Sequence, residues 1–544
     1  MGSLWIRTVK FTKENPRKFY LIGFVAITIA FAIFYLRTFS YSFVWDDQTY
    51  IEKNKNLTKP PLLNMFRPQG AQQGEMEQHS HFLRAVTQSF RPTEFLSHWL
   101  DVHIFGMDAY WMKVSSYLVF SICLFFAGLL IFEFFGSNWL AFAGIVFWAV
   151  HPLSVEPIVY ISGRGDLLSG LFALISFWFA LKVLKKERYW RWILLSTLAY
   201  LFSLFSKEGL LGLPLAILLI GIPFTINVAG KRKRLATLFI VQVGASIFYL
   251  LIRDLVIHIA SGRMYFKEAI IQVPGLMMDF WSSFFQPLHL SVGRLYDSRW
   301  MPVGWFILVL ALSGFIFLIV QRKVKKDLTV ALCFFLAVPV LLGPSAVEVM
   351  DSKVAADRYY FIPVLFSIIC VMFLFIELFR QVSVKKPIFI FLFSFVFLGF
   401  FLLSWKQMEY WKSNRSLFKR EVEEAPQNAM GYYRLSTTYK DINRTVPLLE
   451  YAIRLDPNNQ LALNNLGIYA MRSERLDYAI ELFTRAIEHG HSVTIRPFYN
   501  RALAYLKRGN LEFACSDLRR ALMMNGSYQK ARDLWDQICR TSVK

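Results

Sequence analysis

Charged residues are scarce in this chain. They make up 18% of its 544 residues, whereas soluble domains normally carry about a quarter. Hydrophobic residues make up 55% and gather in runs long enough to cross a bilayer. The first run, Phe19–Phe39, lacks the small-residue cleavage site that ends a secretory signal peptide. The composition therefore excludes a soluble protein and predicts a polytopic membrane protein whose first span is retained as an anchor.

Acidic residues are also few, with 38 Asp and Glu against 60 Lys and Arg, which gives a formal net charge of +22. A nucleic-acid-binding surface would need these basic residues on one continuous face. They lie instead in short clusters between apolar runs, at Lys182–Arg191, Lys231–Arg234, Gln321–Lys326 and Lys385–Lys386. Basic clusters between spans are typical of cytoplasmic loops, so the charge indicates topology and no nucleic-acid partner is expected.

Cysteine is rare, with five residues and no Cys-x-x-Cys pair, so the sequence suggests no zinc site. Cys123, Cys333 and Cys370 lie inside apolar runs, where a thiol packs as a small apolar side chain. Cys515 and Cys539 lie near the C-terminus and would pair in an oxidising compartment. Free thiols are the favoured expectation for these two residues.

Eleven runs are long enough to be membrane spans. They cover approximately 19–39, 113–135, 139–157, 166–184, 190–206, 209–228, 235–257, 301–320, 328–346, 359–380 and 387–405. With the basic N-terminus in the cytoplasm, alternate threading places all four basic clusters there and the C-terminus outside. Two segments of the outside loops, 91–106 and 274–290, are rich in apolar side chains and are expected to lie on the bilayer surface.

After Trp411 the long apolar runs disappear and a period of about 34 residues begins, the spacing of tetratricopeptide repeats. Small residues recur at matching positions: Gly467 corresponds to Ala502, and Ala479 corresponds to Ala514. The sequence therefore divides into a membrane domain, 1–411, and a repeat domain, 412–544. The repeat domain is an α-solenoid of about three repeats plus a capping helix, and it is predicted to lie outside the cytoplasm.

Five motifs occur in order along the membrane domain and are followed by the repeats. They are FVWDD (43–47), RP (91–92), HPLSVEPIVYISGRGDLLS (151–169), SKEG (206–209) and AADRYYFIP (355–363). This ordered set resembles the transmembrane and tetratricopeptide-repeat O-mannosyltransferases and their bacterial relatives over nearly the whole chain. The resemblance implies an all-α GT-C fold, the multi-span architecture of glycosyltransferases that use polyprenyl-phosphate-linked sugars. The repeat array is shorter than is common in that family, which leaves the acceptor open.

Asp46 and Asp47 follow the first span closely. From the residues alone they are either exposed acids that cap a helix or a functional pair. The resemblance implies the functional interpretation, with Asp46 as the catalytic base and Asp47 as an orienting or acceptor-binding neighbour. Adjacent side chains on an extended segment point to opposite faces, so the two acids are expected to serve different tasks.

Three basic residues, Arg164, Lys207 and Arg358, are candidates for contact with the donor phosphate. Ionisable groups near a span end usually face a cavity or one another, a guanidinium binds phosphate oxygens in a bidentate fork, and the resemblance implies this role for Arg358. Structural alternatives remain open for each. Arg164 would pair with Asp166 or Glu156, Lys207 with Glu208, and Arg358 would anchor at the headgroups. The further candidates for the lining of the cavity are Arg91, His151, Glu156, Asp166, Glu208 and Tyr359.

Two functions follow. The first is an inverting membrane glycosyltransferase that moves mannose or another hexose from a polyprenyl-phosphate donor to a hydroxyl, expected to be a Ser or Thr of a protein, on the outer face of the membrane. It requires no cofactor, although the residues do not exclude a divalent metal. Its partners are the lipid donor, membrane lipids and a protein or peptide held by the repeats. The alternative is a non-catalytic, membrane-anchored repeat scaffold that recruits envelope or lumenal proteins.

The arrangement of the motifs distinguishes these two functions. An enzyme should gather them around one cavity, whereas a scaffold should scatter them. The membrane itself is less well defined by the sequence. The short repeat array and the Phe- and Lys-rich composition favour a bacterial inner membrane with periplasmic repeats, and an endoplasmic reticulum membrane with lumenal repeats is the alternative.

Overall fold

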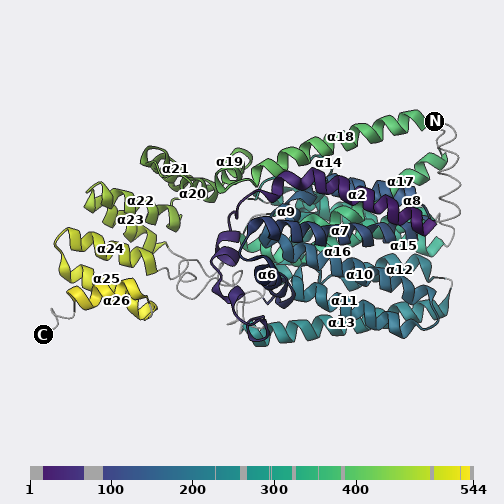
Figure 1. The fold of residues 1–544 in the computed structure, drawn as a ribbon, viewed down its shortest axis with the longest axis horizontal. Helices are drawn as coiled ribbons and strands as arrows, with labels where there is room; N and C mark the ends of the chain where they lie inside the picture. The colour runs from purple at the N-terminus through teal and green to yellow at the C-terminus, as the bar shows by residue number, and fades with distance from the viewer. Residues whose placement is uncertain are drawn as a thin grey trace. The chain divides into compact units, whose positions relative to one another are not determined.

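The computed structural model describes residues 16–65, 90–226, 228–257, 266–292, 294–295, 297–321, 326–352, 355–381, 386–489, 495–526 and 528–539. Within these ranges the regular elements are helices and no β-strand occurs, so the predicted all-α class is confirmed (Figure 1). The chain divides into two compact units. The helices up to α18 form the membrane unit, and the helices from α19 onward form the repeat unit.

The membrane unit is a bundle of mostly apolar helices, which range from short ones of four or five residues to one of 29 residues. They are α2 (Pro16–Phe39), α3 (Pro61–Asn64), α6 (Pro92–Phe105), α7 (Ala109–Phe135), α8 (Asn138–Val150), α9 (Val155–Val159), α10 (Arg164–Lys185), α11 (Tyr189–Ser206), α12 (Leu213–Gly221), α13 (Ala229–Ile257), α14 (Phe266–Phe285), α15 (Met301–Gln321), α16 (Lys326–Ser352), α17 (Phe361–Gln381) and α18 (Lys386–Tyr410). Every one of the eleven predicted apolar runs corresponds to a helix or to a broken helix.

Eight helices of the described ranges are long and apolar enough to cross a membrane. A ninth is obtained if α8 and the helical turns that follow it, bent by 71°, make one span. These helices fit the predicted multi-pass membrane protein, while the count of eleven spans stays a prediction. The run predicted at 209–228 is a shorter apolar stretch, Glu208–Phe224, that is interrupted by turns.

The two ends of α10 carry opposite kinds of chemistry. Its first turn holds the motif residues Arg164 and Asp166, and its last turn holds two lysines that form ion pairs with Glu133 of α7. Because a helix rises 1.5 Å per residue, about 33 Å separates these ends. Arg234 donates a hydrogen bond of 2.9 Å to the carbonyl of Lys186, which brings a second basic cluster to the lysine end. Two basic clusters therefore share the end of the bundle opposite the motifs.

One predicted surface segment is instead part of the bundle. Residues 274–285 belong to α14, which packs against α15 and α16. Leu276, Met277 and Phe280 are fully buried. The prediction of a segment lying flat on the bilayer is therefore wrong here, because these side chains form one helical stripe that finds a protein partner. The other segment, α6, buries Phe95 and exposes Ile104, so its contact with the bilayer stays a prediction.

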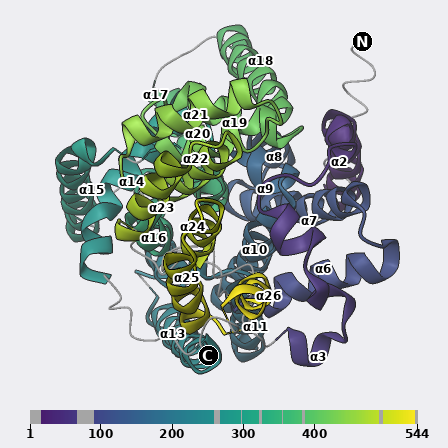
Figure 2. The same cartoon turned by 90° about the vertical axis from the view of Figure 1, so that its left-hand side faces the viewer.

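The repeat unit consists of short helices in which each packs against the next (Figure 2). They are α19 (Asn414–Glu424), α20 (Ala429–Ser436), α21 (Ile442–Leu455), α22 (Gln460–Arg472), α23 (Leu476–Glu488), α24 (Ile495–Lys507), α25 (Leu511–Met524) and α26 (Gln529–Ile538). Gly467 of α22 faces Phe483 of α23 so closely that a Cβ atom at Gly467 would lie 2.6 Å from the ring. The small residue at this repeat position therefore has the predicted cause, a close approach between paired helices.

The expectation of free thiols at Cys515 and Cys539 is wrong. The two residues form a disulfide, which joins α25 to the residue that follows α26. Their Cα atoms lie 5.7 Å apart because α26 folds back along α25. Sequence spacing alone does not reveal this return of the chain. Cys123, Cys333 and Cys370 are buried free thiols, as predicted.

Candidate functional site

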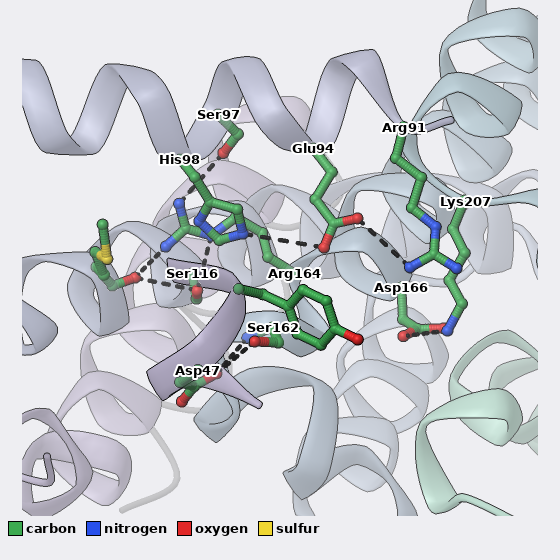
Figure 3. Close-up of polar contacts among 12 residues, drawn as sticks. Asp47, Arg91, Glu94, Ser97, His98, Ser116, Ser162, Arg164, Asp166 and Lys207 are labelled. Atoms are coloured by element: carbon green, nitrogen blue, oxygen red, sulfur yellow. Dashed lines mark hydrogen bonds and ion pairs between the residues drawn. The ribbon is translucent and has the colours of Figure 1, made fainter. Parts of the chain in front are cut away.

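Motif residues from separate parts of the sequence meet around the N-terminal end of α10 (Figure 3). The contacts join the loop after α2, the start of α6, the turns between α8 and α10, the end of α11 and the turn before α17. Each of these segments carries one of the five sequence motifs. The motifs are thus gathered and not scattered, which is the arrangement expected of a catalytic or binding site.

The two adjacent acids have different surroundings. Asp47 is fully buried, and its Oδ1 accepts hydrogen bonds from the backbone N and the hydroxyl of Ser162 at 2.8 and 2.7 Å. Its Oδ2 accepts a bond of 3.3 Å from the backbone N of Val44. Asp46 is partly exposed, and its Oδ2 accepts a bond of 3.1 Å from the Tyr160 hydroxyl. Asp47 therefore joins two loops, while Asp46 keeps a carboxylate at a partly open position.

Burial raises the pKa of the Asp47 carboxyl to about 6. The positive charge of Lys113 and the hydrogen bonds from Ser162 and Val44 act in the opposite direction and do not cancel this effect. A carboxylate that accepts several hydrogen bonds is normally held ionised, so the loss of water outweighs the donors at this position.

Arg358 and Lys207 converge on one carboxylate. Lys207 Nζ lies 2.9 Å from Asp166 Oδ2, and Arg358 Nε lies 3.9 Å from the same oxygen. Arg358 also pairs with buried Glu156, with Nη1 and Oε1 2.7 Å apart. The ring of Tyr359 lies 5.2 Å from Lys207 Nζ and 5.3 Å from Arg358 Cζ, within cation–π range of both. Two cations held side by side in this way are suited to bind an anionic group.

Arg91 forms the next part of the site, together with an acid that the sequence analysis missed. It pairs with Glu208 at 3.3 Å and with Glu94 at 3.7 Å. A Cβ atom at Gly165 would lie 2.7 Å from a carboxylate oxygen of Glu94, so the small residue of the SGRGD sequence admits this side chain. Burial raises the pKa of Glu94, and the charge of Arg91 opposes the rise. The signal for Glu94 was its place one helical turn after Arg91.

Arg164 does not pair with either of the expected carboxylates, Asp166 or Glu156. It is fully buried and forms its ion pair with Asp101 of α6. It also donates to the Ser116 hydroxyl at 3.1 Å, the Ser97 hydroxyl at 3.3 Å and the carbonyl of Met112. The expected partners lie near Arg164 in the sequence. The actual partner, Asp101, is distant in the sequence and reaches Arg164 because α6 packs over the start of α10. The guanidinium in this structure therefore joins α6, α7 and α10.

His151 likewise has backbone partners. Its Nδ1 accepts a hydrogen bond of 3.2 Å from the backbone N of Leu153, and its Nε2 lies 3.1 Å from the carbonyl of Phe284. A neutral ring protonated on Nε2 satisfies both contacts. These bonds fix the turn after α8 against α14. In the part of the chain that the structure describes, no three His, Cys, Asp or Glu side chains are grouped to hold a metal ion.

Comparison with known proteins supports the resemblance seen in the motifs. No protein-family model matches the chain. Curated relatives are protein O-mannosyl-transferases. F38B6.6 from Caenorhabditis elegans is 27% identical over 38% of this chain and 29% of its own length. TMTC4 from Mus musculus is 24% identical over 79% of this chain and 65% of its own length. Xenopus laevis tmtc2 is 30% identical over 32% of this chain and 21% of its own length.

The chain thus spans less than two thirds of the length of each of these relatives. These three relatives confirm the resemblance to the transmembrane and tetratricopeptide-repeat O-mannosyltransferases. Their names support a glycosyltransferase and do not by themselves identify the donor.

The raised pKa of Asp47 predicts a pH-dependent effect of Asp47→Asn. The Asp47 carboxyl keeps its proton up to about pH 6 in the folded state and only up to about pH 4 in the unfolded state. The contribution of this protonated carboxyl to the free energy of unfolding is therefore complete below pH 4 and is lost as the pH rises through 6. We expect the stability advantage of the wild type over the variant to shrink by about 3 kcal/mol across that window. Apparent melting temperatures in detergent at pH 4 to 7 measure it. A gap that stays constant with pH contradicts the assignment.

Proposed function

We propose that the protein is an inverting membrane glycosyltransferase. It transfers a hexose, with mannose as the first candidate, from a polyprenyl-phosphate donor to a hydroxyl of a protein Ser or Thr. The reaction takes place at the end of the bundle that carries the motifs. Asp46 is the catalytic base, and Arg358 and Lys207 bind the donor phosphate.

One observation carries this proposal: Tyr160 links a carboxylate to the cation pair. Its hydroxyl donates to Asp46, and its ring centroid lies 5.9 Å from Arg358 Cζ. A transferase of this class needs a proton acceptor on one side of the anomeric carbon and positive charge around the leaving phosphate on the other. Tyr160 therefore contacts both the proposed proton acceptor, Asp46, and one of the proposed phosphate-binding cations, Arg358.

The proposed reaction is a single displacement. The acceptor oxygen forms a bond to the anomeric carbon while the bond from that carbon to the phosphate oxygen breaks. The proton of the attacking hydroxyl goes to the Asp46 carboxylate, and the electron pair of the broken bond stays on the phosphate. The products are the glycosylated acceptor, with the configuration at the anomeric carbon inverted, and a polyprenyl phosphate whose charge Arg358 and Lys207 stabilise.

The other candidate residues support these groups. Glu156 and Asp166 are the carboxylates that hold Arg358 and Lys207. Asp47 positions Asp46 through its bonds to Ser162, and we assign no acceptor contact to its buried side chain. Arg164 has the same kind of supporting role beneath the site, since its donors are used within the protein.

The gathering of the motifs favours this function over the scaffold. A scaffold needs its membrane helices only as an anchor, and it has no requirement for cations and carboxylates from five segments at one place. Buried charges are costly near a bilayer, so they are kept where a function uses them. In a scaffold only the repeat unit would bind partners, and the charged groups of the membrane unit would have no role.

We propose that the site and the repeats lie outside the cytoplasm. The basic clusters at the opposite end of α10 support this orientation through the positive-inside rule. The disulfide of the repeat unit supports it independently, because disulfides persist in oxidising compartments. The animal relatives fit the endoplasmic reticulum alternative, and the bacterial inner membrane stays a prediction. An epitope at the C-terminus that is reached only from the cytoplasmic side of sealed vesicles would contradict this orientation.

Asp46→Asn should lower kcat by roughly 10²–10⁴-fold, the usual contribution of a general base. The amide keeps the shape and can still accept a hydrogen bond from Tyr160, so the affinity for the donor should change little. The measurement is transfer of radiolabelled mannose from a short-chain polyprenyl phosphate to an acceptor peptide, with donor binding measured in parallel.

Asp108→Asn is the matched control, because Asp108 caps the start of α7 and Asn caps a helix equally well. It should transfer at the wild-type rate. Wild-type turnover by Asp46→Asn would show that the base is elsewhere, and loss of turnover by the control would show that the assay detects general damage.

Arg358→Lys should weaken binding of the donor about tenfold or more. The change keeps the charge but removes the planar fork that binds two phosphate oxygens at once. Arg380→Lys is a matched control, because Arg380 lies in the last turn of α17 and also pairs with a carboxylate, Asp327. Equal donor affinity in wild type, Arg358→Lys and Arg358→Ala would overturn the assignment.

We propose that the repeats hold the protein acceptor and do not take part in the chemistry, since stacked helix pairs form a continuous binding surface. Removal of the residues after Ser413 should raise KM for a folded protein acceptor at least tenfold more than KM for a short Ser peptide. The melting temperature of the shortened protein shows whether its membrane unit is folded. An equal loss with both acceptors in a folded protein counts against this role.

A further inference from the structure

Trp45 has a backbone conformation that its side chain disfavours. It lies in a tight turn closed by the bond from the backbone N of Asp47 to the carbonyl of Val44, 3.0 Å long. Its φ is +51°, whereas Asp46, the next residue of the turn, is not among the described residues with positive φ. Turns with a positive φ only at the first central position strongly favour glycine there. A bulky aromatic residue in that place is strained, and strain of this kind collects at functional sites.

The comparison with Glu474 shows that Trp45 is unusual. These two are the only non-glycine residues with positive φ in the part of the chain that the structure describes. Glu474 follows the end of α22, where the backbone N of Arg475 donates to the carbonyl of Ala470 at 3.0 Å. A left-handed residue is common at such a helix end. Trp45 precedes its helical turn, so it lacks this local explanation.

The indole of Trp45 lies beside the proposed catalytic acid. It stacks on Tyr160 with ring centroids 5.8 Å apart and planes 17° apart, and Tyr160 donates its hydroxyl to Asp46. Trp45 is partly exposed. The strained turn thus presents an aromatic surface and a carboxylate from adjacent residues at one place.

We propose that the indole of Trp45 is the platform on which the pyranose ring of the donor stacks. This inference rests on the proposed function and adds a sugar subsite to it. One face of a hexopyranose carries C–H groups that pack against an aromatic π face, while its hydroxyls need polar partners. Stacking on Trp45 holds the anomeric carbon next to Asp46. A turn with glycine at this position would be relaxed but would have no ring.

Three variants of Trp45 separate the ring from the backbone. Trp45→Ala and Trp45→Gly both remove the ring, but only glycine also removes the strain, so the glycine variant should melt at the higher temperature. Trp45→Phe keeps a smaller ring. The probes are a short-chain polyprenyl phosphate mannose and the same polyprenyl phosphate without the sugar, each titrated against the full chain in detergent. The readout is the ratio of the two Kd values.

The preference for the mannosyl lipid, given by the ratio of the two Kd values, should fall about five- to tenfold in the alanine and glycine variants and about twofold in Trp45→Phe. Binding of the lipid without sugar should stay the same in all variants. Trp111→Ala is the matched control, because Trp111 is an exposed indole stacked on Phe105 at 5.0 Å. It should keep the wild-type ratio.

Three results overturn the inference. An unchanged ratio in both ring-free variants shows that the sugar is held elsewhere, while the proposed donor stands. A ratio that falls in Trp45→Ala but not in Trp45→Gly shows that backbone geometry matters and the ring does not. A wild type that binds both lipids equally well shows that the sugar contributes nothing to binding and overturns the stacking platform, whereas the proposed donor fails only if the wild type also transfers no mannose from it.

Discussion

The buried guanidinium of Arg164 is the contact on which the site end of the membrane unit depends. A charge without water is tolerated only when its partners are close and its donors are used. Asp101 supplies the countercharge, and hydroxyl and carbonyl oxygens of α6 and α7 accept the remaining bonds. Since Arg91 immediately precedes α6, Glu94 lies in its first turn and α10 carries Asp166, this contact fixes the distance between the halves of the site. Removal of either partner would leave an uncompensated buried charge.

Around this anchor the site alternates charges of opposite sign. Glu156, Arg358, Asp166 and Lys207 follow one another, and Arg91 stands between Glu94 and Glu208. Near a bilayer each cation needs a countercharge to stay ionised in the absence of substrate. Under the proposed function, the donor phosphate would share the cations with these carboxylates or displace the carboxylates from them. Binding would then exchange one set of ion pairs for another. The carboxylates lower the free-energy cost of holding the cations in the site before the donor binds.

The adjacent acids show how one short segment serves two purposes. Asp47 is buried and joins the turn at 44–47 to Ser162, and this fixes the partly exposed Asp46 beside Tyr160. The same turn holds Trp45 in a conformation that glycine would prefer. Local preference and tertiary structure disagree at this turn, and such disagreement is expected at functional positions more than in the core.

Hydropathy and charge by themselves determined the all-α class, the helical runs and the basic clusters, because the bilayer imposes length and composition on each segment separately. The ordered motifs also singled out Asp46, Arg358 and Lys207 as candidates, since these residues occur in short local patterns. Only the tertiary structure decided which groups meet. It paired Arg164 with Asp101, joined Cys515 to Cys539, brought α14 into the bundle and buried Asp47 while leaving Asp46 partly open. Each of these contacts joins segments through the return path of the chain, and that path depends on helix packing, which no local pattern encodes.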